Sequence, residues 1–486
     1  MSSTSARPFS WAEWSALDGV EIAGHIRQGS VTVSEVALQA AEALHWVDER
    51  LAALVEVFPS PVFDAAASGG CLSGVPIVLK DLGSSLAGVR QEQGSALFRG
   101  HRATETDPLV ANLLDGGLSI VGRSACAELG MSYDTTSDYR GLRVTRNPWH
   151  SDFSPGGSSG GSAALVAAGA LPIAHGSDGA GSIRIPAALC GLIGLKVTRG
   201  RLPMPWRMNE YGNPGMVEGF LTRSVRDTAA AIDAASSRLP PGSSFVVQHC
   251  PWPSLRDALA QQLPRLRIGI GTGRWGRADS VPRDAIDSVS AIAAKLSTEG
   301  HSVEIVDDRV IADWDAFWGG FQSFWVGVRP TWWPADTEDA VATPILQHYR
   351  KAAASHDKMS ILRHAAHVKR SSLAFGGLFE RLDLLLTPTL GSAAPIAHGA
   401  LSTCRDRAFE DFIGDLMDSG RYTIPANETG LPAITIPIGI GIDSVPLGLQ
   451  AIAPWHREDR LLQLALALLR DPGRPTSAPA VHIARA

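Results

Sequence analysis

Two glycine-wrapped serines, one on each side of a small-residue helix, constrain this chain more than any other feature. Residues 155–186 read PGGSSGGSAALVAAGALPIAHGSDGAGSIRIP. Ser158 lies in the first glycine cluster and Ser182 in the second, 24 residues further on. Glycine admits positive φ, and backbone N–H groups in such turns can point together at a ligand. The pattern is typical of a nucleophile beside an oxyanion hole.

Lys80 is the candidate base for this chemistry. It ends the apolar run GVPIVLKDL, and no acid–histidine pair lies beside the serines in the sequence. A serine hydroxyl needs a base to take its proton. A lysine can be that base only when its pKa falls below the usual value of about 10.4, which burial at a strand end would achieve. Asp81 follows directly, but neighbours on a strand point to opposite faces, so it need not hold the lysine charged.

Bulk properties exclude several classes of protein. The 486 residues are 45% hydrophobic, and the net charge of −6 leaves no basic surplus for nucleic acid or an anionic membrane. The odd number of scattered cysteines argues against a disulfide scaffold or zinc ribbon: Cys71, Cys126, Cys190, Cys250 and Cys404. The amino terminus has no signal-peptide pattern, and the apolar run 163–174 is too short to span a bilayer. We therefore expect a cytoplasmic enzyme with no metal, membrane or nucleic-acid partner.

Alternating helical and strand patterns predict an α/β fold. Residues 20–57 are helical in pattern, with a break at Gly29 and Ser30 and a new cap at Thr32. The other expected helices are 107–114, 163–170, 283–300 and 457–469, and the expected strands are 75–79, 118–121, 171–174, 266–270, 302–306, 384–386 and 433–439. Without repeats or linkers, residues 1–486 are predicted to form one domain, with amino-terminal helices (1–60), a catalytic core (70–200) and a helical region (310–375).

The helical region is rich in tryptophan, which leaves two interpretations open. It holds Trp314, Trp318, Trp325, Trp332 and Trp333. Such a segment could be a lid or pocket wall over the site, or the packing face of a helix, because aromatics at helical spacing usually belong to a core.

Other motifs compete with the serine–lysine interpretation. Residues 156–160 match the G-x-S-x-G nucleophile elbow, but its histidine, for which His398 is a candidate, has no recognisable setting. Residues 271–276 match G-x-G-x-x-G, yet six residues intervene before the next helix, so a turn is favoured over a dinucleotide site. His364 and His367 lack a third metal ligand. His175 is close to Ser182 in sequence, and we expect it to be hydrogen-bonded structure.

Four segments together resemble the amidase signature family. They are GVPIVLKDL, NPWHSDFSPGGSSGGSAA, GSDGAGSIRIPAALCGLIGLKVTRGRLP and GLPAITIPIG, spread over most of the chain. The resemblance implies an α/β fold with a large mixed β-sheet flanked by helices on both faces. It also implies Ser182 as nucleophile, Ser158 as a serine relay behind a cis Gly157–Ser158 peptide, and Lys80 as base. The wording AHGSD-x-AGS-x-RIPA is similar to the branch of bacterial cyclic nylon-oligomer hydrolases.

The same resemblance assigns further roles around Ser182. It implies an oxyanion hole built from the N–H groups of Gly179, Ala180, Gly181 and Ser182, with Asp178 and Arg184 bracing the loop. Ala180 stands where the family more often has glycine, and Ile185 stands where glutamyl-tRNA amidotransferase subunits carry glutamine.

We also expect the segment around Glu128 and Met131 to contact substrate. The expected partner is a small-molecule amide, with an apolar or aryl group and no cofactor, and a homodimer is compatible with the sequence. Three rivals stay open: an ester or carbamate hydrolase with the same triad, an amidotransferase subunit that needs a partner chain, and a non-catalytic binding protein. Retention of Lys80, Ser158 and Ser182 argues against the last.

Overall fold

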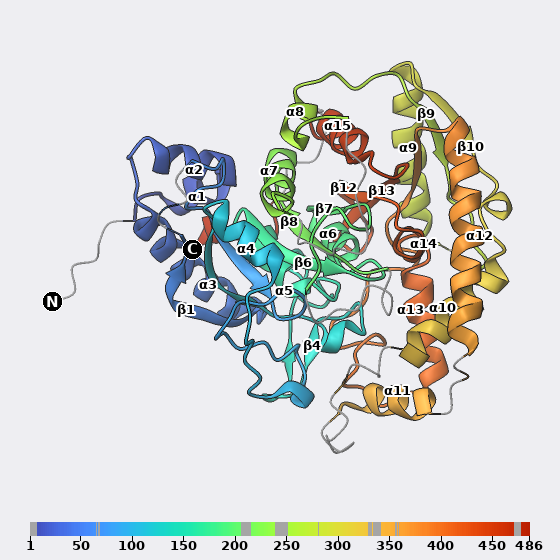
Figure 1. The fold of residues 1–486 in the computed structure, drawn as a ribbon, viewed down its shortest axis with the longest axis horizontal. Coiled ribbons are helices and arrows are strands. Elements are labelled where there is room, and N and C mark those ends of the chain that lie inside the picture. Colours follow the sequence, from blue (N-terminus) through green and yellow to red (C-terminus); the bar gives the residue numbers. More distant parts are fainter. Residues whose placement is uncertain are drawn as a thin grey trace.

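The computed structural model describes residues 7–64, 66, 69–205, 215–238, 251–279, 281–328, 333, 342–354, 357, 359–470 and 478–486. Its centre is a mixed sheet of eight strands in the order β10-β9-β11-β13-β12-β7-β8-β6 (Figure 1). The strands are β6 (Ile173–Asp178), β7 (Ile193–Lys196), β8 (Val217–Thr222), β9 (Arg267–Ile270), β10 (Ser302–Ile305), β11 (Leu384–Pro388), β12 (Ala433–Ile440) and β13 (Pro446–Ile452). The β10–β9–β11 pairs are parallel and the remaining pairs are antiparallel.

Lys80 belongs to a second, smaller sheet. Its three strands, in the order β1-β3-β2, are β1 (Leu54–Val62), β2 (Pro76–Lys80) and β3 (Ser119–Ser124). A two-stranded pair, β4 (Thr136–Ser137) with β5 (Arg143–Val144), follows. The helical prediction for residues 54–57 was wrong, because these residues leave the preceding helix through Ala52, at φ 51°, and pair with β3 instead.

The helices confirm most of the predicted segments and flank both faces of the large sheet (Figure 1). They are α1 (Trp11–Ala16), α2 (Gly19–Arg27), α3 (Val33–Leu51), α4 (Pro108–Asp115), α5 (Gly160–Ala167), α6 (Arg184–Cys190), α7 (Val225–Ala235), α8 (Leu255–Leu259), α9 (Arg283–Thr298), α10 (Trp314–Val328), α11 (Pro344–Ala354), α12 (Met359–Arg381), α13 (Phe409–Ser419), α14 (Ile424–Thr429) and α15 (Glu458–Leu469). Thr32 caps α3 as predicted, because its side chain accepts from the Glu35 N–H while Glu35 reaches back to the Thr32 N–H.

The tryptophan-rich segment forms a packed core. Helix α10 lies beside α12 at the right of Figure 1. The side chains of its three tryptophans, Trp314, Trp318 and Trp325, are buried. Trp314 stacks on Trp275 with ring centroids 5.1 Å apart, and Trp318 donates to the Trp275 carbonyl. This favours the packing-face interpretation. Trp332 and Cys250 lie outside the described residues.

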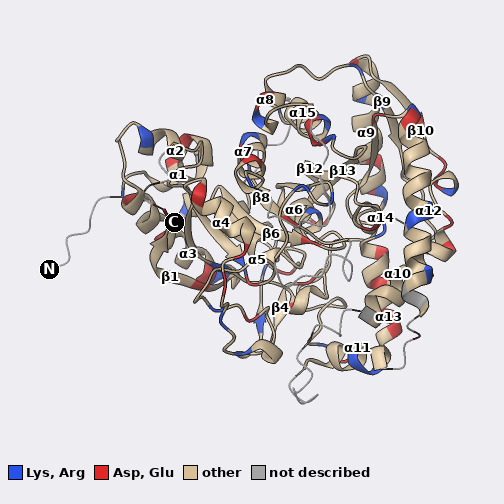
Figure 2. Cartoon of the chain, in the orientation of Figure 1, with Lys and Arg blue, Asp and Glu red and all other residues tan. Residues whose placement is uncertain are grey.

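Charged residues of both signs share the same outer helices, among them α8 and α12 (Figure 2). Among the described helices, none is both long enough and apolar enough to cross a membrane. Within the same residues, no group of three or more His, Cys, Asp or Glu side chains could hold a metal ion.

Candidate active site

Lys80 lies at the end of β2 with its side chain fully buried. Its Nζ donates to Ser158 Oγ at 2.7 Å and to Ser177 Oγ at 3.0 Å. The partner Ser158 stands between a cis peptide bond and the start of α5. Lys80, the candidate base, and Ser158, the candidate relay, are 78 residues apart in the sequence but are directly hydrogen-bonded in the fold.

Asp81 points away from this cluster, as expected for the next residue on a strand. It is fully buried and pairs with Arg123, with 3.3 Å between Arg123 Nε and Asp81 Oδ1. It also accepts the N–H groups of Glu92 and Gly94. Burial raises the pKa of the Asp81 carboxyl, against the opposing effect of the Arg123 charge. Both carboxylate oxygens are thus hydrogen-bonded on this side, Oδ1 with Glu92 and Arg123 and Oδ2 with Gly94.

Ser182 lies in the turn between β6 and α6, and it is 5% exposed. A backbone hydrogen bond connects this turn to the segment of Ser158. The Ser159 N–H donates to the Ser182 carbonyl at 3.3 Å. Tyr133 Oη and Thr423 Oγ1 both donate to the Ala180 carbonyl at 2.7 Å, which holds that carbonyl in place.

One of the four N–H groups expected in the oxyanion hole already has a hydrogen-bond partner. The Gly181 N–H donates to Asp178 Oδ1 at 2.6 Å, so it is occupied within the protein. Among described residues, the N–H groups of Gly179, Ala180 and Ser182 have no recorded hydrogen-bond acceptor. These three remain as candidate donors to a substrate oxygen.

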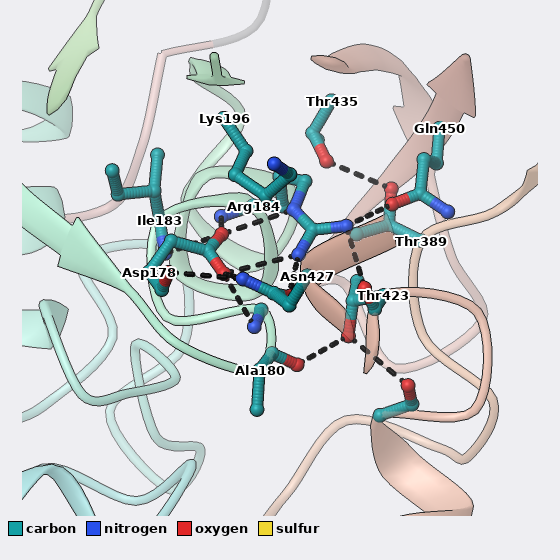
Figure 3. Close-up of polar contacts among 12 residues, drawn as sticks. Asp178, Ala180, Ile183, Arg184, Lys196, Thr389, Thr423, Asn427, Thr435 and Gln450 are labelled. Atoms are coloured by element: carbon teal, nitrogen blue, oxygen red, sulfur yellow. Dashed lines mark hydrogen bonds and ion pairs between the residues drawn. The ribbon is translucent and has the colours of Figure 1, made fainter. Parts of the chain in front are cut away.

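Asp178 and Arg184 form a buried ion pair beneath the loop (Figure 3). Both side chains are fully buried, with Arg184 Nε 3.0 Å from Asp178 Oδ2. Asn427 Nδ2 donates to Asp178 Oδ1 at 2.9 Å, and Arg184 Nη1 donates to Gln450 Oε1 at 2.7 Å. Burial opposes ionisation of Asp178, but the Arg184 charge and these hydrogen bonds hold its pKa below the usual range. The pair thus contacts the loop through the Gly181 N–H, in keeping with the bracing role that the family resemblance implies.

Comparison with known proteins identifies the family. The profile described as Amidase matches residues 35–462. The chain belongs to the amidase signature family. Enzymes of this family hydrolyse carbon–nitrogen amide bonds, and the chain is an amidase in this sense.

Relatives of this amidase align over nearly its whole length. It is 33% identical to the AmiC protein of Mycobacterium tuberculosis, over 94% of this chain and 95% of that one. It is 30% identical to the 6-aminohexanoate-cyclic-dimer hydrolase of Paenarthrobacter ureafaciens, over 91% of this chain and 92% of the relative.

Solved structures agree with this assignment. A 6-aminohexanoate cyclic dimer hydrolase superposes with a TM-score of 0.84 at 28% identity, covering 95% of this chain and 99% of that one. A bacterial aryl acylamidase of the amidase signature family superposes with a TM-score of 0.79 at 25% identity, covering 96% and 100%.

Glu128 and Met131, the expected substrate contacts, are both buried in this amidase, and their contact with a substrate stays a prediction. Met131 is fully buried in the aromatic core, the hydrophobic cluster that contains Trp275 and Trp314. Glu128 is 1% exposed and accepts hydrogen bonds from the hydroxyls of Ser95, Thr343 and Thr403. Its carboxylate therefore ties three segments of the protein together. The segment still adjoins the site, since a Cβ on Gly130 would lie 3.5 Å from Ser158 Oγ.

Glu128 makes stability depend on pH. Burial raises its pKa to about 7 from a reference of 4.5, although the three hydroxyls act in the opposite direction. Between these values the folded protein keeps a proton that the unfolded chain has released, so stability falls as pH rises. We expect the wild type to lose about 3 kcal/mol relative to Glu128→Gln between pH 4.5 and 8.

Urea denaturation of both proteins across this range measures that difference. Other buried carboxyls with raised pKa values, such as Asp134 and Asp227, titrate in both proteins and cancel in the comparison. Glu49→Gln, on the exposed end of α3, is the matched control. A constant gap between wild type and Glu128→Gln from pH 4.5 to 8 would contradict the prediction.

Gly181 is required for a steric reason. Its φ is 130°, and a Cβ there would lie 2.4 Å from Thr423 Oγ1. We expect Gly181→Ala to displace the loop together with the neighbouring Ala180 and Ser182 N–H groups, and to lower kcat by roughly 100-fold, the effect of losing one of these oxyanion donors. Gly24→Ala in α2 is the control, since a Cβ there meets nothing within 4 Å. Equal kcat values for the two variants would refute this.

The remaining sequence candidates lie in structural settings. His398 Nδ1 contacts Ser402 Oγ at 3.0 Å, and His364 Nε2 contacts Glu428 Oε2 at 2.6 Å. Residues 271–276 form the turn after β9, as expected.

Sequence reasoning missed Ser177, Thr423 and Asn427. For Ser177 a signal was present, because it lies between His175 and Asp178 in the strand that leads to the nucleophile loop.

Proposed function

We propose that this amidase cleaves a small amide through Ser182 as nucleophile, Ser158 as relay and Lys80 as base. The hydrogen bond of 2.7 Å between Lys80 Nζ and Ser158 Oγ carries the proposal. A hydroxyl both donates and accepts, so Ser158 can take the proton of Ser182 while passing its own to the amine.

The reaction then proceeds in two halves. Ser182 Oγ attacks the amide carbon, and the negative charge that develops on the carbonyl oxygen faces the N–H groups of Gly179, Ala180 and Ser182. The proton held by Lys80 returns through Ser158 to the leaving amine as the carbon–nitrogen bond breaks. Water gives a proton to Lys80 through Ser158 and attacks the acyl-enzyme; the same proton then returns through Ser158 to Ser182 Oγ as the ester bond breaks and the acid leaves.

We propose small apolar or aryl amides, linear or cyclic, as the substrate class. Thr423 contacts the Ala180 carbonyl, and the adjacent Tyr422 lies edge-on to Trp275 with ring centroids 5.2 Å apart. The aromatic core thus reaches the loop of the nucleophile. The relatives named for a cyclic amide and for aryl acylamides support the same class.

Hydrolysis assays with purified protein test the proposal. The substrates are anilides, linear aliphatic amides and cyclic amides, with matched esters and carbamates. We expect turnover of at least one amide, and we expect Lys80→Ala to lower it by roughly 100-fold or more because the general base is lost. Lys369→Ala, on the exposed face of α12, is the control. If only esters or only carbamates are hydrolysed, the proposal of amide hydrolysis fails and the protein is an ester or a carbamate hydrolase with the same triad. No turnover at all by the isolated chain would favour the partner-dependent amidotransferase.

A further inference from the structure

A buried histidine–glutamate pair lies against the backbone of Lys80, and the proposed chemistry does not use it. His175 on β6 and Glu218 on β8 are both fully buried. His175 Nε2 lies 2.5 Å from Glu218 Oε2, and the Lys80 N–H donates to His175 Nδ1 at 3.2 Å. The pair connects the eight-stranded sheet to the strand that carries the candidate base.

These contacts define the state of the imidazole. An N–H donor to Nδ1 requires a lone pair on that atom, so the ring hydrogen sits on Nε2 and is donated to Glu218. Two hydrogen bonds in series thus link the Lys80 N–H to the His175 ring and the ring to the Glu218 carboxylate. Gly83 leaves room for the Glu218 carboxylate at the end of this chain, because a Cβ on Gly83 would lie 2.7 Å from Glu218 Oε1.

The Lys80 N–H needs a partner from outside its own sheet. β2 is an edge strand that pairs with β3 alone. The Asp81 N–H points toward β3 and donates to the Ser124 carbonyl, so the Lys80 N–H points to the open edge. His175 satisfies this buried donor by accepting its hydrogen bond.

Strand β6 contacts Lys80 both at its backbone N–H and at the tip of its side chain. Ser177 lies two residues after His175 on β6, on the same face and roughly 6.5 Å further along the strand. His175 fixes the backbone at the base of the lysine, and Ser177 Oγ accepts from its Nζ at the tip. The amine is thereby aligned along β6 toward Ser158.

We propose that His175 and Glu218 are positioning residues for the amine of Lys80, a role that rests on the proposed function of Lys80 as the base. They hold the end of β2 so that Nζ stays within hydrogen-bond distance of Ser158 Oγ. Misplacement of a catalytic group by about 1 Å can cost roughly 100-fold in rate. Loss of the anchor therefore lowers kcat and leaves KM unchanged, because neither residue touches substrate.

Two variants of nearly equal shape isolate the hydrogen bond. His175→Asn keeps an oxygen near the Nδ1 position that accepts from the Lys80 N–H, whereas His175→Leu removes it. Both lose the ring and the Glu218 contact, and they differ in whether the Lys80 N–H keeps an acceptor. The expected result is a kcat about 100-fold below wild type for Leu and within about 10-fold for Asn, with KM unchanged in both. Equal kcat values for the two, or a change confined to KM, would overturn the proposal.

Glu218→Gln covers the case in which the His175 variants do not fold. The amide oxygen of glutamine still accepts from Nε2–H, so the positioning role predicts a kcat within about 3-fold of wild type for Gln, whereas Glu218→Leu removes the acceptor and is expected to lower kcat by about 100-fold with KM unchanged. Equal kcat values for the Gln and Leu variants would overturn the proposal. A loss of 100-fold in the Gln variant, with the protein folded by circular dichroism, would overturn the proposal in favour of a role for the charge.

The rate of Ser182 labelling by a fluorophosphonate separates this inference from the proposed function. If wild-type protein is labelled but hydrolyses no amide, the amidase substrate proposal fails. The Asn and Leu variants of His175 still decide the positioning role through their labelling rates. If wild-type protein is folded and not labelled, Ser182 is not activated, and the positioning role fails with it.

Discussion

Ser182→Ala is expected to abolish turnover, with a loss of kcat of roughly 10⁶-fold. The variant removes the only atom that forms the acyl bond in the proposed mechanism, while the N–H donors of the loop and the Lys80–Ser158 hydrogen bond stay in place. The residue is 5% exposed and small, so the fold should tolerate the loss of one oxygen. Intact-mass measurement after fluorophosphonate treatment should show one adduct on the wild type and none on the variant.

Ser290→Ala is the matched control for this experiment. Ser290 is an exposed serine on α9 whose hydroxyl donates to the Ile286 carbonyl. It should retain both turnover and labelling. Peptide mapping that finds the adduct on Ser158 or Ser177 instead of Ser182 would show that the nucleophile is misassigned.

Arg184→Met is expected to cause the largest loss of stability, about 3–5 kcal/mol in the free energy of unfolding. The substitution leaves the Asp178 carboxylate fully buried without its cation. It also removes the donors to the Thr423 carbonyl and Gln450, at 2.9 and 2.7 Å. Urea denaturation midpoints at neutral pH measure the effect.

Arg283→Met provides the comparison, because Arg283 pairs with Asp287 on α9 while both side chains are exposed. An exposed pair of this kind contributes about 0.3–0.5 kcal/mol. If Arg184→Met costs no more than Arg283→Met, the buried pair is not what holds the loop. A double variant that also carries Asp178→Asn should recover part of the loss, since the uncompensated charge is then absent.

The sequence predicted the parts of the site that depend on local pattern. Ser158 and Ser182 were recognisable from their glycines, and Lys80 from its place at the end of an apolar run. The capped helix at Thr32 was predictable for the same reason, because the side chain and the N–H group that it satisfies lie three residues apart. The catalytic roles of these residues stay predictions.

The parts that could not be predicted depend on contacts between distant segments. Ser177 and His175 meet Lys80 only because β6 lies against β2, across 97 and 95 residues of chain. The hydrogen bond from Gly181 to Asp178 depends on the path of the turn, which the residue pattern leaves open. The hydrogen bonds that Glu128 accepts could not be predicted either, because the donors Thr343 and Thr403 lie more than 200 residues away in the sequence.

The Asp178–Arg184 pair also has a consequence for how the protein is made. Every group proposed to react is synthesised within the first 182 residues, yet Arg184 finds its acceptors on Thr423, Asn427 and Gln450. A nascent chain that has not yet passed residue 450 therefore carries the complete chemical set without the support that shapes the nucleophile loop. We therefore expect the loop that carries Ser182 to reach its final shape only after the strand that carries Gln450 has been synthesised.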